Sequence, residues 1–112
     1  MYEKYIKDAL PYYNPDGVLK EYRFTKKQIL ELIDECLKNK EQILGIVVLL
    51  NPSETEYGEA CGFFNTDVLK IDSVNKISLL AKEYISSIDE GEEHVFYSLE
   101  LESGHLIPKL VL

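Results

Sequence analysis

The sequence has no tryptophan, one methionine and only two cysteines, Cys36 and Cys61, in 112 residues. Two cysteines are too few for a disulfide-held scaffold, so a reducing cytoplasm is the expected location. Long apolar runs are also missing, because the longest, Ile43–Leu50, is far shorter than the ~20 residues of a membrane span. Met1–Tyr5 has no apolar core and no cleavage signature, so we expect no secretory leader.

Motifs of known chemistry are absent as well. The chain has no Cys-x-x-Cys, His-Glu-x-x-His or Gly-x-Ser-x-Gly sequence and no glycine-rich phosphate loop. Asp89 could begin a calcium loop, but the sixth position is His94, where an EF-hand needs glycine. We therefore expect no catalytic residues, no metal ligands and no cofactor, and a binding protein rather than an enzyme.

Basic residues are scarce after the first 40 positions. Residues 1–40 contain eight basic and seven acidic side chains, a net charge of +1. Residues 41–112 contain four basic and 13 acidic side chains, a net charge of −9. Nucleic acid should be repelled by this region, whereas a basic protein surface should be attracted. Solubility alone is the competing explanation of the acidity.

Two segments, 26–39 and 73–88, carry the apolar stripe of an amphipathic helix. Thr25 and Gln28 form a capping-box pattern at the start of the first. Asp72 or Ser73 suits the N-cap of the second. We expect both segments to pack on one face of a sheet.

The N-terminal 24 residues suggest a short helix before Pro11, a turn at Asn14–Gly17 and an extended segment over 18–24. The next residues include Lys26 and Lys27, which stand at the helix end that disfavours cations. This basic and aromatic stretch could contact nucleic acid. Solvated lysines are the simpler interpretation, with a function or an unseen acidic neighbour as the alternatives.

The middle of the chain predicts a buried central strand at Gln42–Leu50. Ala60–Ile71 fits either a hairpin turning at Asn65–Asp67 or one bulged strand. The choice matters, because strand direction sets where the flanking loops lie. A hairpin would put the loops 51–59 and 89–93 at opposite ends of the molecule, and a bulged strand would put them together.

The C-terminal segments 94–101 and 105–112 predict a β-hairpin closed at Ser103–Gly104. In that register Leu101 faces Leu106, and one face becomes wholly apolar. The whole pattern predicts a single α+β domain over residues 1–112. We expect a mainly antiparallel sheet of about four to five strands, with both helices on one face.

Histidines and cysteines are the first candidates for chemistry. The two histidines fall at opposite ends of the predicted hairpin and could not share a metal, and His105 could pair with Glu102 across the turn. Cys36 belongs to the apolar stripe of the first helix and is expected to be buried. A Cys61–His dyad assembled by the fold stays open as an alternative, although no motif supports it.

Two loops concentrate acidic residues, which repel one another in a compact fold. Loops on a rigid scaffold often carry binding residues, and a tyrosine among acids suits a lysine- and arginine-rich partner. Two solvated loops without a function are the alternative. The predicted partner-binding residues are Glu54, Glu56, Tyr57, Glu59, Asp89, Glu90, Glu92 and Glu93.

In size, acidity and lack of catalytic motifs, the chain resembles small bacterial inhibitor proteins such as toxin-immunity proteins, antitoxins and phage anti-defence proteins. The resemblance is one of type and covers no alignable motif. It implies an inhibitor that blocks a basic, nucleic-acid-acting enzyme, toxin or nuclease-like, through acidic loops, with no direct nucleic-acid or membrane contact. A small cytoplasmic enzyme with a Cys/His or carboxylate site, and a homodimeric adaptor joined through the outer hairpin face, are the alternatives.

Overall fold

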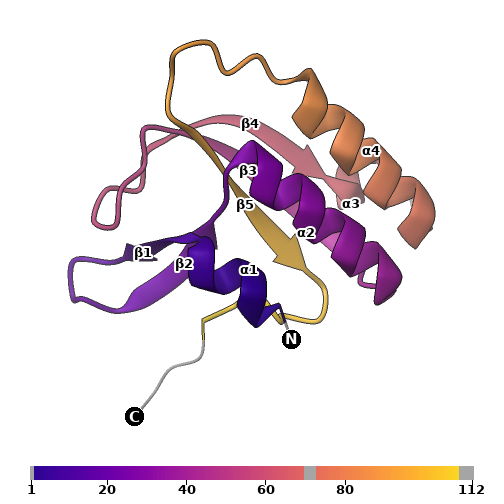
Figure 1. The fold of residues 1–112 in the computed structure, drawn as a ribbon, viewed down its shortest axis with the longest axis horizontal. Helices are drawn as coiled ribbons and strands as arrows, with labels where there is room; N and C mark the ends of the chain where they lie inside the picture. Colours follow the sequence, from indigo (N-terminus) through magenta and orange to yellow (C-terminus); the bar gives the residue numbers. More distant parts are fainter. Residues whose placement is uncertain (1, 70–72, 109–112) are drawn as a thin grey trace.

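The computed structural model describes residues 2–69 and 73–108, and it has an α+β fold with two antiparallel sheets (Figure 1). One sheet pairs β1 with β2, and the other has the order β4-β3-β5. In the described part of the chain, no helix has the length and apolar character needed to span a membrane. The elements are α1 (Glu3–Asp8), β1 (Leu10–Tyr13), β2 (Leu19–Arg23), α2 (Lys26–Lys38), β3 (Ile43–Leu50), β4 (Glu59–Asn65), α3 (Thr66–Leu69), α4 (Val74–Ser87) and β5 (Val95–Leu101).

Helices α2 and α4 lie side by side over one face of the three-stranded sheet, as predicted, and both begin and end within one residue of the predicted bounds (Figure 1). The capping box of α2 is complete. The Gln28 amide donates to Thr25 Oγ1 (3.2 Å), and the Thr25 amide donates to Gln28 Oε1 (2.8 Å). The Ser73 hydroxyl caps α4 by accepting from the Lys76 amide. Local capping signals therefore fix where the two helices start.

The N-terminal segment follows the prediction and adds a strand. The short helix α1 precedes β1, and the turn around Asn14 leads into β2, the predicted extended segment. Asn14 Oδ1 accepts from the amides of Asp16 and Val18, each at 3.0 Å, which closes this turn. The sequence did not predict β1. This strand pairs with β2, and the pairing satisfies backbone N–H and C=O groups of both strands.

Strand β3 is the centre of the larger sheet. Ala60–Ile71 follows neither predicted alternative, because β4 is a bulged strand that ends at Asn65 and residues 66–69 are helical. Val48 pairs with Gly62, and Leu49 pairs with Ala60, so Cys61 is the extra residue of a β-bulge. Helix α3 follows β4 directly. Residues 70–72, the end of the segment that the sequence left open, lie outside the described residues.

The predicted C-terminal hairpin is not confirmed, and the four to five strands are divided between two sheets. Residues 105–108 are turn and irregular structure instead of a strand. Gly104 N donates to Leu101 O and Ile107 N donates to Gly104 O, each at 3.0 Å, so the chain makes two successive turns after β5. Phe24 and Tyr97 exchange two backbone hydrogen bonds of 2.8 Å, which occupies the β5 edge that the hairpin needed. Residues 109–112 of the expected strand lie outside the described residues.

The two faces of the three-stranded sheet differ. Ile46, Val48 and Tyr97 point toward the helices and are almost fully buried. On the other face, the open face, Val47 lies between Phe63 and Ser98 in one cross-strand row, and only the β1-β2 hairpin and the segment after β5 flank it. The expected burial of β3 on both faces therefore holds at Leu49, which is 0% exposed, and not at Val47, which is half-buried.

Candidate protein-binding site

The two acidic loops meet at one end of the larger sheet. We name them the 51–58 loop, between β3 and β4, and the 88–94 loop, between α4 and β5. Because β3 is antiparallel to both neighbours, its carboxyl end lies beside the amino ends of β4 and β5 (Figure 1). Asn51 joins the loops directly. Its amide donates to His94 O (2.7 Å), and its Nδ2 donates to Glu93 Oε2 (3.3 Å).

Internal hydrogen bonds and two left-handed residues fix the backbone of the 51–58 loop. Ser53 N donates to Glu56 O (2.9 Å), and Ser53 Oγ accepts from Glu56 N (3.0 Å). Asn51 and Gly58 have φ values of 52° and 89°. A Cβ on Gly58 would lie 2.8 Å from the carbonyl oxygen of Leu50, so only glycine fits there. Glu54 and Glu56 thus project from a constrained loop.

A buried arginine anchors the same loop to the β1-β2 hairpin. The Arg23 side chain is fully buried, and its guanidinium carbon lies 4.3 Å from the ring centroid of Tyr12 and 4.8 Å from that of Tyr57. The two rings meet edge to face with centroids 5.5 Å apart. Glu21 Oε1 accepts from Arg23 Nη2 (2.7 Å) and from Nε (3.1 Å). Stacking and charge together hold Tyr57 in place.

The 88–94 loop is held by β5 and by its own turns. The buried Tyr97 hydroxyl donates to Glu90 Oε2 at 2.7 Å. Burial, together with this hydrogen bond to a carboxylate, raises the pKa of Tyr97 well above its ordinary value. Gly91 N donates to Asp89 Oδ1 (3.1 Å), and Glu93 N donates to Glu90 O (3.0 Å). Glu90 is therefore a structural residue of this loop.

The eight predicted binding residues have different surroundings. Tyr57 packs on Arg23, Glu90 accepts from Tyr97, and Glu93 accepts from Asn51, although the Tyr57 side chain remains 44% exposed. Asp89 accepts from a loop amide. The remaining four are exposed and make no side-chain hydrogen bond or ion pair to the residues that the structure describes: Glu54, Glu56, Glu59 and Glu92.

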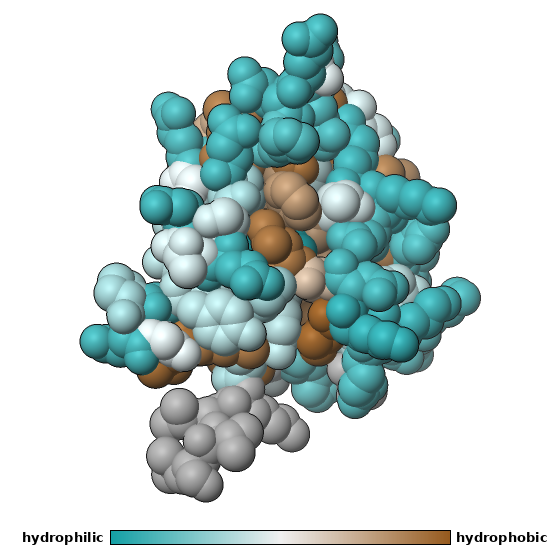
Figure 2. Space-filling model, turned by 60° about the vertical axis from the view of Figure 1, so that its left-hand side comes forward, coloured by the Kyte–Doolittle hydropathy of each residue, from teal (hydrophilic) through white to brown (hydrophobic). Residues whose placement is uncertain are grey.

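Positive charge near these loops is limited. Lys26 Nζ donates to the carbonyl of Ile88 (2.6 Å), at the start of the 88–94 loop, and Arg23 is buried and paired with Glu21. Across residues 2–69 and 73–108, no ion pair involves any of the six carboxylates of the two loops or that of Glu59, the first residue of β4. Figure 2 shows hydrophilic side chains over most of the visible face, with hydrophobic residues in a narrow strip between them.

Neither cysteine is arranged for nucleophilic catalysis. Cys36 is fully buried, as predicted, and burial raises the pKa of its thiol to about 11, which keeps it protonated. Cys61 is exposed, but within the described residues it makes no hydrogen bond to His94 or His105. In the same part of the chain, no three His, Cys, Asp or Glu side chains are grouped closely enough to hold a metal ion.

His105 has a structural partner different from the one predicted. Its Nδ1 lies 2.8 Å from Oε1 of Glu41, which is 8% exposed, so the expected pairing with Glu102 across the turn is wrong. The Tyr2 ring lies against the imidazole, with centroids 6.2 Å apart. The chain turns back after β5, so the His105 imidazole lies against Glu41, in the segment between α2 and β3.

Sequence reasoning missed the residues that assemble this site. Asn51 is the first residue after the predicted strand, and its link to Glu93 spans 42 positions. Arg23 belongs to the predicted extended segment over 18–24, and nothing local marks it as buried. One available signal is the extended segment itself, in which alternate side chains point to opposite faces, so Arg23 could point inward. This pattern does not show which residues would surround the guanidinium.

Six carboxylates on two constrained loops, with Glu59 beside them at the start of β4, can attract and hydrogen-bond cationic groups. The partly exposed Tyr57 ring can pack against the aliphatic stems of those groups. This arrangement suits recognition of a basic surface better than bond-making chemistry. No protein-family model matches the chain, and no curated protein or solved structure matches it significantly.

Proposed function

We propose that this protein is a stoichiometric inhibitor that binds a basic, nucleic-acid-acting enzyme through the 51–58 and 88–94 loops. The observation that carries the proposal is the link between these loops through Asn51, which gathers their six carboxylates, with Glu59 beside them, at one end of the sheet. The protein would occupy the basic surface on which the enzyme binds nucleic acid. Inhibition would follow from competition for that surface.

Preorganisation supports this function. A loop that is ordered before binding loses less conformational entropy in the complex. Ser53, Gly58 and the Arg23 stack hold the 51–58 loop, and Tyr97 holds the 88–94 loop. Concentrated negative charge also steers a basic partner toward the site and raises the association rate.

The first test is capture of the partner from the native host, followed by measurement of affinity and inhibition with both proteins purified. We expect a one-to-one complex, loss of the enzyme's nucleic-acid processing, and an affinity that falls steeply as sodium chloride is raised. An affinity that does not change between low and high salt would exclude the electrostatic version of the proposal.

Charge-matched variants assign the effect to the loops. The triple variant Glu54→Gln, Glu56→Gln and Glu92→Gln removes three exposed charges that have no side-chain partner in the described residues. We expect it to weaken binding by at least about tenfold, mostly through slower association. The control removes the same charge from exposed positions outside the loops, by Glu31→Gln, Glu83→Gln and Glu102→Gln. Equal losses in both triples would mean that net charge, and not the site, drives binding.

A homodimeric adaptor is the second candidate, and the edge position of β4 favours it. In the described residues β4 pairs only with β3, the stretch Ala60–Phe64 has no charged residue to block further pairing, and Phe63 is 67% exposed. The bulge at Cys61 opposes regular pairing along the same edge. Light scattering after gel filtration over a wide concentration range tests it, and a monomer at every concentration would exclude it.

A further inference from the structure

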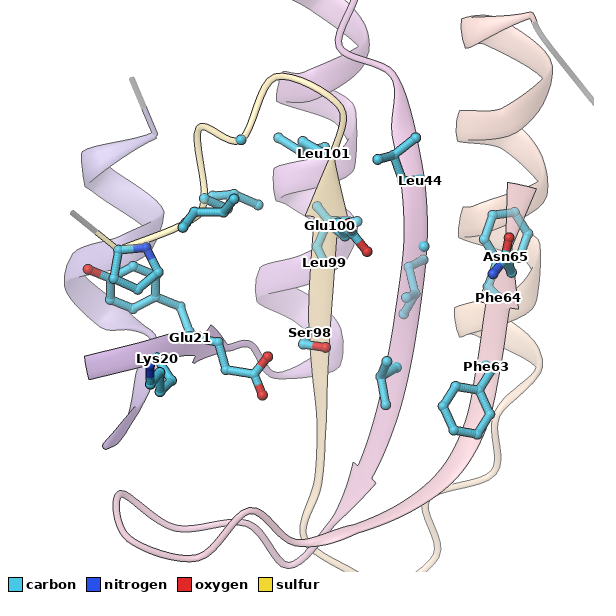
Figure 3. Close-up of a pocket in the computed structure, with 18 residues that line it drawn as sticks. Lys20, Glu21, Leu44, Phe63, Phe64, Asn65, Ser98, Leu99, Glu100 and Leu101 are labelled. Carbon is cyan, nitrogen blue, oxygen red and sulfur yellow. The ribbon is translucent and has the colours of Figure 1, made fainter. Parts of the chain in front are cut away.

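The open face of the three-stranded sheet contains a hollow of about 320 Å³, away from the acidic loops. Its floor is β3, its sides are β4 and β5, and the segment after β5 and strand β2 form the rim (Figure 3). This volume is at the small end of the range for ligand pockets, so it suits one side chain better than a whole cofactor.

A glycine produces the hollow. Gly45 lies between Asn65 and Glu100 in one cross-strand row of the open face, so the middle of that row has no side chain. A Cβ at Gly45 would lie 3.1 Å from the carbonyl oxygen of Phe64, which makes a larger residue strained there. The next row supplies the apolar wall, with Val47 beside Phe63.

Two polar side chains of β5 face this hollow without partners. Ser98 is 9% exposed, lines the hollow, and its hydroxyl makes no hydrogen bond within the described residues. Its hydroxyl oxygen can therefore accept a hydrogen bond from a ligand that enters the hollow. Glu100, two residues on and therefore on the same face, is exposed and forms no ion pair there.

Two other charged side chains, Glu21 and Lys20, lie at the rim of the hollow, and neither pairs with Glu100 in the described residues. Figure 3 shows Glu21 reaching from β2 toward Ser98, but its Oε1 already accepts two hydrogen bonds from Arg23. Lys20 precedes Glu21 on the strand, so it points to the opposite side of β2 and lies at the rim. Glu100 is thus a lining carboxylate that no described cation engages, and it lies beside the Ser98 hydroxyl and the apolar walls.

We propose that this hollow is a binding pocket for a lysine side chain of a protein partner. The aliphatic stem of the lysine lies along Val47 and Phe63, and its ammonium donates to the Glu100 carboxylate and the Ser98 hydroxyl. The inference rests on the proposed function in one respect, which is that the partner is basic. It adds a specific anchor on the open face to the broad attraction of the acidic loops.

The test is a titration of the 15N-labelled protein with N-acetyl-lysine-N-methylamide, followed by NMR. The matched probe is N-acetyl-norleucine-N-methylamide, which has the same four-carbon stem and no ammonium. We expect the lysine probe to shift the amides of Gly45, Val47 and Ser98 with a Kd on the order of millimolar. Binding of the norleucine probe with equal affinity would overturn the proposal.

Variants on β5 and beyond it separate the pocket from general acidity. Glu100→Gln should weaken the lysine probe by at least about fivefold, and Ser98→Ala should weaken it by about two- to threefold. Glu102→Gln removes the same charge from an exposed position outside the pocket and should leave the affinity unchanged. Equal weakening by Glu100→Gln and Glu102→Gln would also overturn the pocket.

The same variants distinguish this inference from the proposed function. The Glu54, Glu56 and Glu92 triple variant should bind the lysine probe normally while losing affinity for the protein partner. If the partner binds with the expected salt dependence and Glu100→Gln has no effect on the lysine probe, only the pocket is refuted. If the lysine probe behaves as expected and the triple variant binds the partner normally, only the role of the loops is refuted.

Discussion

Lys26 Nζ donates a 2.6 Å hydrogen bond to the backbone carbonyl of Ile88, the C-cap residue of α4. Lys26 is the first residue of α2, where a cation is unfavourable for its own helix. At the end of α4 the same cation meets the partial negative charge of the exposed carbonyls. Because α4 has no basic residue in its last turn, a residue 62 positions away supplies that charge.

The Lys26 contact predicts that Lys26→Met destabilises the protein. The variant removes the hydrogen bond and the charge at the C-terminus of α4, so the free energy of unfolding should fall by about 1 kcal/mol. Lys27→Met is the control, because Lys27 is exposed, stands at the same end of α2 and has no side-chain partner in the described residues. Its free energy of unfolding should stay unchanged or rise by a few tenths of a kcal/mol. Urea denaturation measures both, and equal losses would contradict this role of Lys26.

The elements that the sequence predicted well are those with local signals. The capping box of Thr25 and Gln28 and the cap at Ser73 involve residues three positions apart, so they mark both helices within one residue. The aliphatic run Ile43–Leu50 marks the central strand for the same reason. In each case, the residues that determine the structure are neighbours in the chain.

The C-terminal hairpin shows where local signals fail. A turn forms one residue earlier than predicted, with Glu102 and Ser103 at its centre, because Gly104 N donates to Leu101 O. Leu106 is buried, as the register required. The competing contact, between Phe24 and Tyr97, joins residues that are far apart in the sequence. A turn pattern gives no information about which strand already occupies an edge, so the sequence could not exclude the hairpin.

The sequence predicted which acidic residues make up the candidate site, but not that the fold brings the two loops together. Acidic residues on loops are visible in the sequence, but the meeting of the two loops depended on whether Ala60–Ile71 was a hairpin or a bulged strand. The outcome rests on α3, which follows β4 where the hairpin needed a second strand, and on the antiparallel pairing of β5 with β3. That pairing joins strands far apart in the chain, so it has no local sequence signal. The role of Tyr57 likewise depends on Arg23, which is distant in the sequence.

The Asn51 link predicts that Asn51→Asp destabilises the protein through repulsion. Asn51 Nδ2 lies 3.3 Å from Glu93 Oε2, so an aspartate there would face a carboxylate of the same charge. We expect a loss of about 1 kcal/mol in the free energy of unfolding, smaller at high salt because screening weakens the repulsion. The control is Asn51→Gly, which suits the φ of 52° and adds no charge. Chemical denaturation at low and high salt gives the comparison, and a loss in Asn51→Asp that salt does not reduce would argue against the repulsion.

The Arg23 stack predicts separate effects of two substitutions at Tyr57. Tyr57→Ala removes a ring whose centroid lies 4.8 Å from the guanidinium carbon, and should cost about 1 kcal/mol of stability. It should also increase the backbone mobility of the 51–58 loop, measured by 15N relaxation, because the ring is one of its anchors. Tyr57→Phe keeps the ring and should preserve both properties. Unchanged relaxation in Tyr57→Ala would mean that the hydrogen bonds between Ser53 and Glu56 hold the loop without the stack.

Three buried groups predict that the protein loses stability in alkali. Burial raises the pKa of the Cys36 thiol from its ordinary 9.0 to about 11, and burial likewise raises the pKa values of Tyr2 and Tyr97. The folded chain therefore holds these protons at a pH where the unfolded chain has begun to release them. Because the unfolded state then binds fewer protons, the free energy of unfolding must fall as pH rises from 9.0 toward about 11.

Urea midpoints across this pH range, with variants at both cysteines, assign part of the decline to Cys36. Cys36→Ala removes the buried thiol and should make the decline shallower between pH 9.0 and about 11, although the cavity lowers stability at every pH. Cys61→Ser changes an exposed thiol and should leave the slope unchanged. An equally steep decline in Cys36→Ala and the unaltered protein would show that the thiol does not contribute, since a group absent from the chain cannot release a proton on unfolding.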